Sequence, residues 1–101
     1  MRIITITGNL GRDPQRGESE RAPVKLAVAV AGYDRREKAK TTTWYDVACW
    51  GRDGDYVIER CHKGDRVLIV GDEEVVQREG KTFHDVSARV VEVLTSRDGG
   101  K

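Results

Sequence analysis

The sequence is short of cysteine and of long apolar stretches, and both shortages exclude whole classes of protein. No segment approaches the roughly 18 consecutive apolar residues of a transmembrane helix, and the N-terminus lacks the apolar run of a secretory signal. Cys49 and Cys61 stand apart, without the spacing of further Cys or His ligands that a zinc site needs. We therefore expect a cytoplasmic protein with reduced thiols, no membrane association, and neither a metal nor a cofactor.

Patterns of catalytic residues are also missing. The segment Gly8–Gly11 lacks the glycine and lysine spacing of a phosphate-binding loop, and Asp53–Asp55 lacks the remaining ligands of a calcium loop. Cys61 and His62 are adjacent and would point in different directions on a helix, so they do not form a nucleophile and base. His84 lies in a strand pattern as an expected surface or edge residue. The sequence therefore predicts a protein that is not an enzyme.

Charge is nearly balanced, but it is distributed unevenly. The 101 residues carry a net charge of +1, which by itself does not predict a nucleic-acid partner. Residues 1–50 hold nine Lys and Arg against six Asp and Glu, whereas residues 51–101 hold nine against eleven. Any phosphates would therefore have to be bound by local basic segments in the first half of the chain.

Runs of β-branched and apolar residues predict five strands and one helix. The strands are expected over residues 3–7, 24–31, 41–50, 66–71 and 82–94. Gly8-Asn9 is expected to end the first strand and Gly32 the second, with a loop or a short irregular strand within 8–23. The helix is expected to begin at an Asp53 N-cap and to end near Lys63, with an apolar stripe of Tyr56, Val57, Ile58 and Cys61.

Three strands, a helix and two strands is the element order of one all-β fold, the five-stranded OB-fold barrel, with its single short helix between strands 3 and 4. An open α+β sheet has the same elements and is the alternative. We expect one domain over residues 1–95 and a polar, disordered tail over residues 96–101.

Two tryptophans occupy an unexpected side of the third strand. Side chains alternate along a strand, so Trp44, Asp46, Ala48 and Trp50 share one face while Tyr45, Val47 and Cys49 form a core stripe. Trp44 and Trp50 lie about 20 Å apart on a half-polar face, as stacking of unpaired bases requires. The alternative is that one or both pack under the helix or against a second subunit.

A basic segment, residues 33–40, precedes these tryptophans and is expected to form a protruding hairpin. Its four cations outnumber Asp34 and Glu37, and such a segment attracts the phosphate backbone. The cations are Arg35, Arg36, Lys38 and Lys40. Arg12, Lys25 and Arg52 are further candidates for phosphate contacts, with plain surface positions as the alternative.

Three ordered stretches resemble the bacterial and phage single-stranded DNA-binding protein family. They are Gly8–Pro14, Thr43–Gly51 and Lys63–Gly71. The resemblance implies an OB-fold, no catalysis, and sequence-tolerant binding of single-stranded DNA in replication, recombination or repair. It also implies a homotetramer, with a dimer as the alternative.

The resemblance also assigns roles to particular residues. It places Trp44 and Trp50 at base-stacking positions, Tyr33 near a third such position and Arg52 at a phosphate contact. It makes residues 34–42 a basic hairpin that wraps DNA. The sequence departs from the family at Asp72-Glu-Glu74, which is acidic, at an expected short hairpin near Gly80, and at Phe83, which does not coincide with the family's hairpin aromatic.

The acidic, hydrophobic tail tip that recruits repair enzymes in the family is also not found, so recruitment of other proteins is not predicted. Two other functions stay open. Acidic residues 72–74 and the near-zero net charge favour one of them, an OB-fold protein-interaction or primosome accessory module with weak nucleic-acid binding. The other is an RNA-binding barrel of the cold-shock kind.

Overall fold

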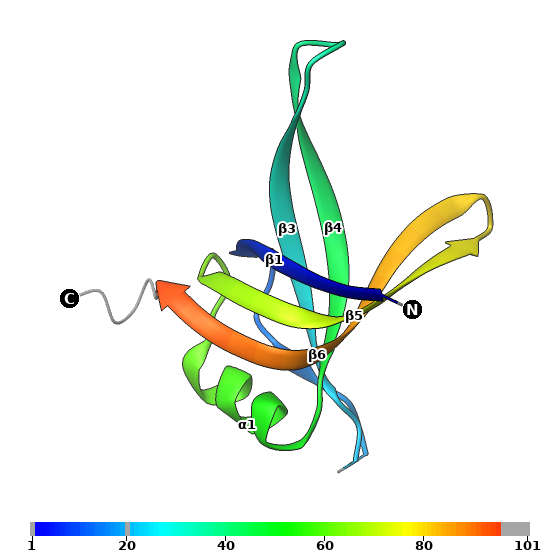
Figure 1. Cartoon of the computed structure of the whole chain (residues 1–101). Coiled ribbons are helices and arrows are strands. Elements are labelled where there is room, and N and C mark those ends of the chain that lie inside the picture. The colour runs from blue at the N-terminus through cyan, green and yellow to red at the C-terminus, as the bar shows by residue number, and fades with distance from the viewer. Residues whose placement is uncertain (1, 20, 96–101) are drawn as a thin grey trace.

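The computed structural model describes residues 2–19 and 21–95, and in them it contains six strands and one helix (Figure 1). The elements are β1 (Arg2–Leu10), β2 (Gln15–Arg16), β3 (Val24–Asp34), β4 (Ala39–Cys49), α1 (Gly51–Arg60), β5 (Arg66–Arg78) and β6 (Lys81–Thr95). The helix α1 lies between β4 and β5, the third and fourth of the long strands, as the sequence predicts.

The five long strands form a closed barrel. The sheet order is β1-β5-β6-β4-β3-β2, and a further pairing of β1 with β3 closes the ring. All pairings are antiparallel except that of β4 with β6, which is parallel and joins Tyr45–Ala48 to residues 84–87. The predicted OB-fold is confirmed, and the open α+β alternative is wrong.

Alternation along the strands fills the barrel interior with small apolar side chains. Leu26 and Val28 of β3, Val47 and Cys49 of β4, and Ile69 of β5 are fully buried. The predicted core stripe of the third strand is therefore confirmed at Val47 and Cys49, while Tyr45 is only half-buried. Burial of such side chains is the main favourable term in folding.

Neither glycine predicted to end a strand does so. β1 continues through Gly8 to Leu10, because glycine allows its backbone to approach β3 so closely that an added Cβ would lie 2.3 Å from the Ala29 carbonyl oxygen. β3 continues through Gly32, which pairs with Thr41, to Asp34. In both cases long-range strand pairing overrides the local preference of glycine for turns.

The helix begins earlier than predicted. Trp50 is the N-cap, with no side-chain hydrogen bond to the helix, and Asp53 lies within the first turn, so the Asp53 N-cap is wrong. The Asp53 carboxylate still stabilises the helix, because it lies near the positive end of the helix dipole. Val57 and Cys61 are buried over one end of the barrel, but Ile58 faces solvent and does not belong to the apolar stripe.

The last two strands form a longer hairpin than the sequence predicts. β5 runs to Arg78, which pairs with Lys81 of β6 across the turn at Glu79-Gly80. The expected end of this strand at Gly71 and the expected short hairpin are therefore wrong. The register shifts between Val70 and Gly71, and this bulge reverses the alternation of β6 after Ala88. Val90 is consequently exposed and Val91 buried.

Two hairpins extend from the barrel, β3–β4 and the outer part of β5–β6 (Figure 1). Their strands pair to the turn, at Asp34 with Ala39 and at Arg78 with Lys81. In the part of the chain that the structure describes, no helix is long and apolar enough to cross a membrane. The predicted disordered tail, residues 96–101, falls outside the described residues.

Candidate nucleic-acid interface

The outward face of the β3–β4 ribbon gathers four of the predicted binding residues. Residues paired across an antiparallel ladder share a face, and the ladder pairs Lys25 with Ala48, Ala29 with Trp44, and Tyr33 with Lys40. The β3 positions of this face between Lys25 and Tyr33 are alanines, at 27, 29 and 31. These short side chains leave the floor beside the tryptophans open.

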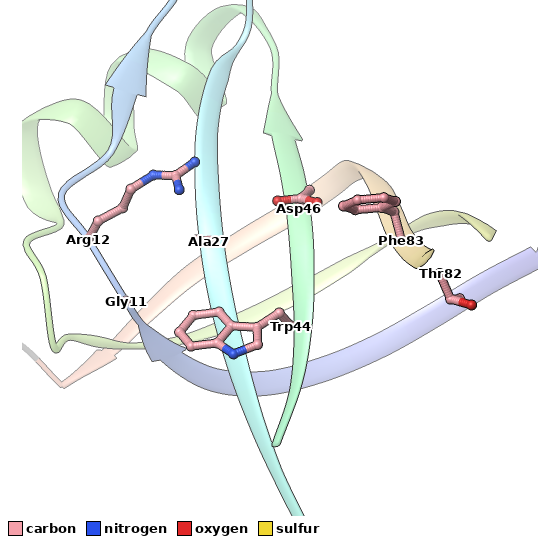
Figure 2. A pocket seen from close by; sticks show the side chains of 7 residues that line it. All are labelled: Gly11, Arg12, Ala27, Trp44, Asp46, Thr82 and Phe83. Carbon is pink, nitrogen blue, oxygen red and sulfur yellow. The ribbon is translucent and has the colours of Figure 1, made fainter. Parts of the chain in front are cut away.

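Trp44 lies on that floor with half of its side-chain surface exposed, at 52%. Its six-membered ring contacts Gly11, where an added Cβ would lie 2.5 Å from Cζ3 and 2.6 Å from Cη2 of the indole. A pocket of about 420 Å³ opens beside the indole and is lined by Gly11, Arg12, Ala27, Trp44, Asp46, Thr82 and Phe83 (Figure 2). Its volume falls in the range of pockets that hold small organic molecules.

Trp50 is placed where β4 ends and α1 begins, and it is 51% exposed. It lines a second pocket of about 220 Å³ with Lys25, Asp46, Ala48, Asp72, Glu74, Asp85, Val86 and Ser87. Neither indole belongs to the buried core. Packing under the helix, the alternative for these tryptophans within one chain, is therefore wrong.

The predicted basic hairpin is the tip of β3–β4. Tyr33 is 60% exposed beside this tip, and Arg35, Arg36, Lys38 and Lys40 are all exposed. The Asp34 carboxylate accepts hydrogen bonds from the backbone N–H groups of Arg36 and Glu37, which holds the turn. In the described part of the chain none of these four cationic side chains is in an ion pair, so all four are available to an anion.

The three further cations are placed differently. Arg12 lines the Trp44 pocket and Lys25 lines the Trp50 pocket, and both line a further pocket of about 260 Å³. Asp46 lines all three pockets, which we together call the groove. Arg52 lies in the first turn of α1, exposed, and does not line these three pockets. The structure thus brings Arg12 and Lys25 to the groove and leaves Arg52 outside it.

The acidic run at residues 72–74 is largely neutralised. Arg89 donates two hydrogen bonds of 2.9 Å to the Asp72 carboxylate. Glu73 is buried and accepts hydrogen bonds from Arg2 and His84, which together hold its pKa below the usual range, His84 having the larger effect. Glu74 alone lacks a partner among the described residues, so the run repels an anion less than its sequence indicates.

Phe83 belongs to the site although the sequence did not place it there. Its ring lines the Trp44 pocket, and the Arg78 guanidinium lies over it at 5.2 Å from the ring centroid. Phe83 shares a face with Asp85 and Ser87, as the alternation of the last strand predicts. What the sequence does not give is the parallel pairing that brings this strand beside β4.

The cysteines and histidines take no part in the groove. Cys49 and Cys61 are free and buried, and burial raises the pKa of Cys49 to about 12 and that of Cys61 to about 11. Over residues 2–19 and 21–95, no three His, Cys, Asp or Glu side chains gather in a way that could hold a metal ion. The groove therefore offers aromatic rings, cations and the carboxylates of Asp46 and Glu74, unpaired among the described residues, to a ligand, and a binding role fits these groups.

Comparison with known proteins agrees with this architecture. The crystal structure of a small single-stranded DNA-binding protein from Streptomyces coelicolor superposes with a TM-score of 0.74 over 91% of each chain, at 18% identity. The mitochondrial single-stranded DNA-binding protein of Drosophila melanogaster is 31% identical over 94% of this chain and 70% of its own length. The sequence pattern of the Single-strand binding protein family matches residues 1–96. The chain therefore belongs to the single-strand binding protein family.

Proposed function

We propose that this protein binds single-stranded DNA by stacking bases on Trp44 and Trp50, with phosphates held by the cations of the β3–β4 hairpin. One observation carries the proposal. Both indoles are half-exposed on the outward face of the barrel, and each borders an open pocket. Exposing the apolar faces of an indole to water costs free energy, and a ligand that covers the ring removes this cost. A nucleic-acid base has an aromatic face of matching size.

The electrostatics support the same ligand. Arg12 and Lys25 line the pockets, and Arg35, Arg36, Lys38 and Lys40 extend the positive charge along the hairpin. Tyr33 lies between these two groups of cations and offers a third ring. Arg52 would contact a strand that leaves the groove past α1. Such a path binds the backbone whatever its sequence.

Membership of the family agrees with the prediction that the chain is not an enzyme, since the family consists of binding proteins. We place the activity in replication, recombination or repair, where single strands are exposed. A cytoplasmic location stays a prediction, and the Drosophila relative is mitochondrial.

Tryptophan fluorescence tests the stacking directly. A mixed pyrimidine oligonucleotide should quench the emission of the wild-type protein, and W44A and W50A should each weaken binding by about 1–3 kcal/mol. I58A is the matched control, because it removes an exposed apolar side chain from α1. Tight binding with unchanged emission, or wild-type affinity in the double variant W44A/W50A, would refute the stacking role.

We also propose that copies of the chain associate through the outer face of β1, β5 and β6. Ile3, Val90 and Leu94 are exposed there, and exposed apolar groups on one face are typical of subunit contacts. Light scattering should give a mass above that of one 11.3 kDa chain, and V90D should lower it. A monomeric wild type would contradict this proposal and leave DNA binding untouched.

The protein-interaction alternative rested on the acidic run at 72–74, of which two members are paired within the chain. Absence of oligonucleotide binding below about 10 μM at moderate salt would favour it, because nonspecific nucleic-acid binding is typically no weaker than about 10⁻⁴–10⁻⁶ M. Equal affinity for RNA and DNA of the same sequence would favour the RNA-binding alternative.

A further inference from the structure

One side chain of the groove is not explained by stacking or by phosphate binding. Asp46 lies on β4 between Trp44 and Trp50, two residues after the first and four before the second, and it lines the pocket of each. It also lines the pocket of about 260 Å³ that Arg12, Lys25 and Arg78 share. Among the residues that the structure describes, its carboxylate has no hydrogen bond and no ion pair. A half-buried acceptor at the centre of the groove is thus left open (Figure 2).

The neighbouring acid differs from it in this respect. The parallel ladder places Asp85 opposite Asp46, and Asp85 accepts a hydrogen bond of 3.1 Å from Arg78. Arg78 also lies over Phe83, and it lines the pocket that Asp46 shares with Arg12 and Lys25, without an ion pair to Asp46. Glu74, which also lacks a partner, lines the Trp50 pocket but not the Trp44 pocket, so Asp46 is the one carboxylate without a partner among the described residues that lines both.

A carboxylate in this place restricts what a bound strand can direct toward it. The carboxylate itself repels phosphates, so a strand stacked on the indoles has to direct base edges toward Asp46 and its backbone toward Arg12, Lys25 and the hairpin cations. An ionised carboxylate only accepts hydrogen bonds. Cytosine offers its N4 amino group to such an acceptor, whereas thymine presents the oxygen O4 at the same position.

We propose that Asp46 selects bases that carry an exocyclic amino group, so that the groove prefers cytosine to thymine. This inference rests on the proposed function and refines it, because stacking alone accepts every base while the carboxylate adds a bias. Adenine, with its N6 amino group, should be accepted as well. One good contact between a side chain and a base edge changes the affinity for the wrong base by about fivefold or more.

The experiment compares oligonucleotides of about 16 nucleotides, the upper range of sites for one OB-fold, by quenching of tryptophan fluorescence at pH 8. The ligands are oligo-dC, oligo-dT and an oligo-dC with two methyl groups on each N4, which still stacks but cannot donate a hydrogen bond. Each is titrated into the wild type, D46N and E59Q. The last is the matched control, since it removes one negative charge from the exposed face of α1.

We expect the wild-type preference for oligo-dC over oligo-dT to fall at least fivefold in D46N and to persist in E59Q. We expect the methylated oligonucleotide to bind the wild type more weakly by the same factor, a result that needs no variant. Equal gains for all three ligands in D46N would show that Asp46 only repels phosphates and would overturn the inference alone. Failure of the wild type to bind any of them would overturn the proposed function as well.

Discussion

Oε2 of Glu73 lies 3.0 Å from Nδ1 of His84, in a buried contact between β5 and β6. Arg2 of β1 donates from Nε to the other carboxylate oxygen at 2.9 Å, and the His84 ring packs against Tyr45 of β4 with centroids 5.2 Å apart. Since an ionised carboxylate only accepts hydrogen bonds, Nδ1 carries the proton. This cluster joins four strands of the barrel, and His84 is a structural residue, not the simple surface position expected from sequence.

The lowered pKa of Glu73 makes the stability of the barrel sensitive to acid. The carboxylate stabilises the fold at pH values above its unfolded pKa of about 4.3, and this contribution is lost as the pH falls through the lower pKa of the folded state. E73Q should cost about 1.5–3 kcal/mol at pH 7, the value of hydrogen bonds to a charged group, and should reduce the loss of stability at acid pH.

Urea unfolding at several pH values measures this effect. E92Q, at an exposed position of β6, should retain the wild-type acid limb. An acid limb in E73Q as steep as that of the wild type would show that Glu73 is not the titrating group.

G11A should weaken DNA binding by displacing the Trp44 indole. An added Cβ would meet the Trp44 ring at about 2.5 Å, so the indole has to leave its position. We expect a change in tryptophan emission and binding weaker by about 1 kcal/mol, within the range of a single stacking interaction. In the W44A background G11A should have no further effect, and an additive loss would contradict this coupling.

Both thiols should be inert in the native protein. Burial is the main cause of the raised pKa values of Cys49 and Cys61, with further contributions from Asp53 and Asp65 respectively. A thiol reagent at pH 8 attacks the thiolate, so it should modify neither cysteine until denaturant unfolds the chain. Stoichiometric modification at neutral pH without denaturant would mean that the end of the barrel under α1 opens readily.

The hairpin cations should determine the salt dependence of binding. R35A/R36A should reduce the slope of log K against log salt by about 0.7 for each phosphate that the hairpin no longer neutralises. R60A/K63A removes the same charge near α1 and serves as the control. An equal reduction in both variants would mean that net charge, not the hairpin, attracts the strand.

Strand content and the exposed tryptophans could be predicted because they depend on local patterns. The alternation of Val47 and Cys49 with Trp44 and Trp50 already separates a core face from an open one. Several positions where prediction failed depend on strand pairing. β3 continues through Gly32 because Thr41 pairs with it, and Val90 turns outward because of a bulge opposite Gly71.

The pockets themselves could not be predicted for the same reason. Gly11 lies under Trp44 from a different segment, and Phe83 reaches the same pocket only through the pairing of β6 with β4. The sequence did not predict that the acidic run at residues 72–74 is largely neutralised. Its partners Arg2, His84 and Arg89 are distant from it along the chain and come close only through strand pairing.

The parallel pairing of β4 with β6 also decides when the groove can exist during folding. It joins only residues 45–48 to residues 84–87, yet the ring of strands needs it, and it places Asp85 and Phe83 beside Asp46. Contacts this distant in sequence require the costly closure of a long loop. During synthesis, Trp44 and Trp50 leave the ribosome well before the other wall of their groove, so on the proposed function we expect DNA binding only after the last strand docks.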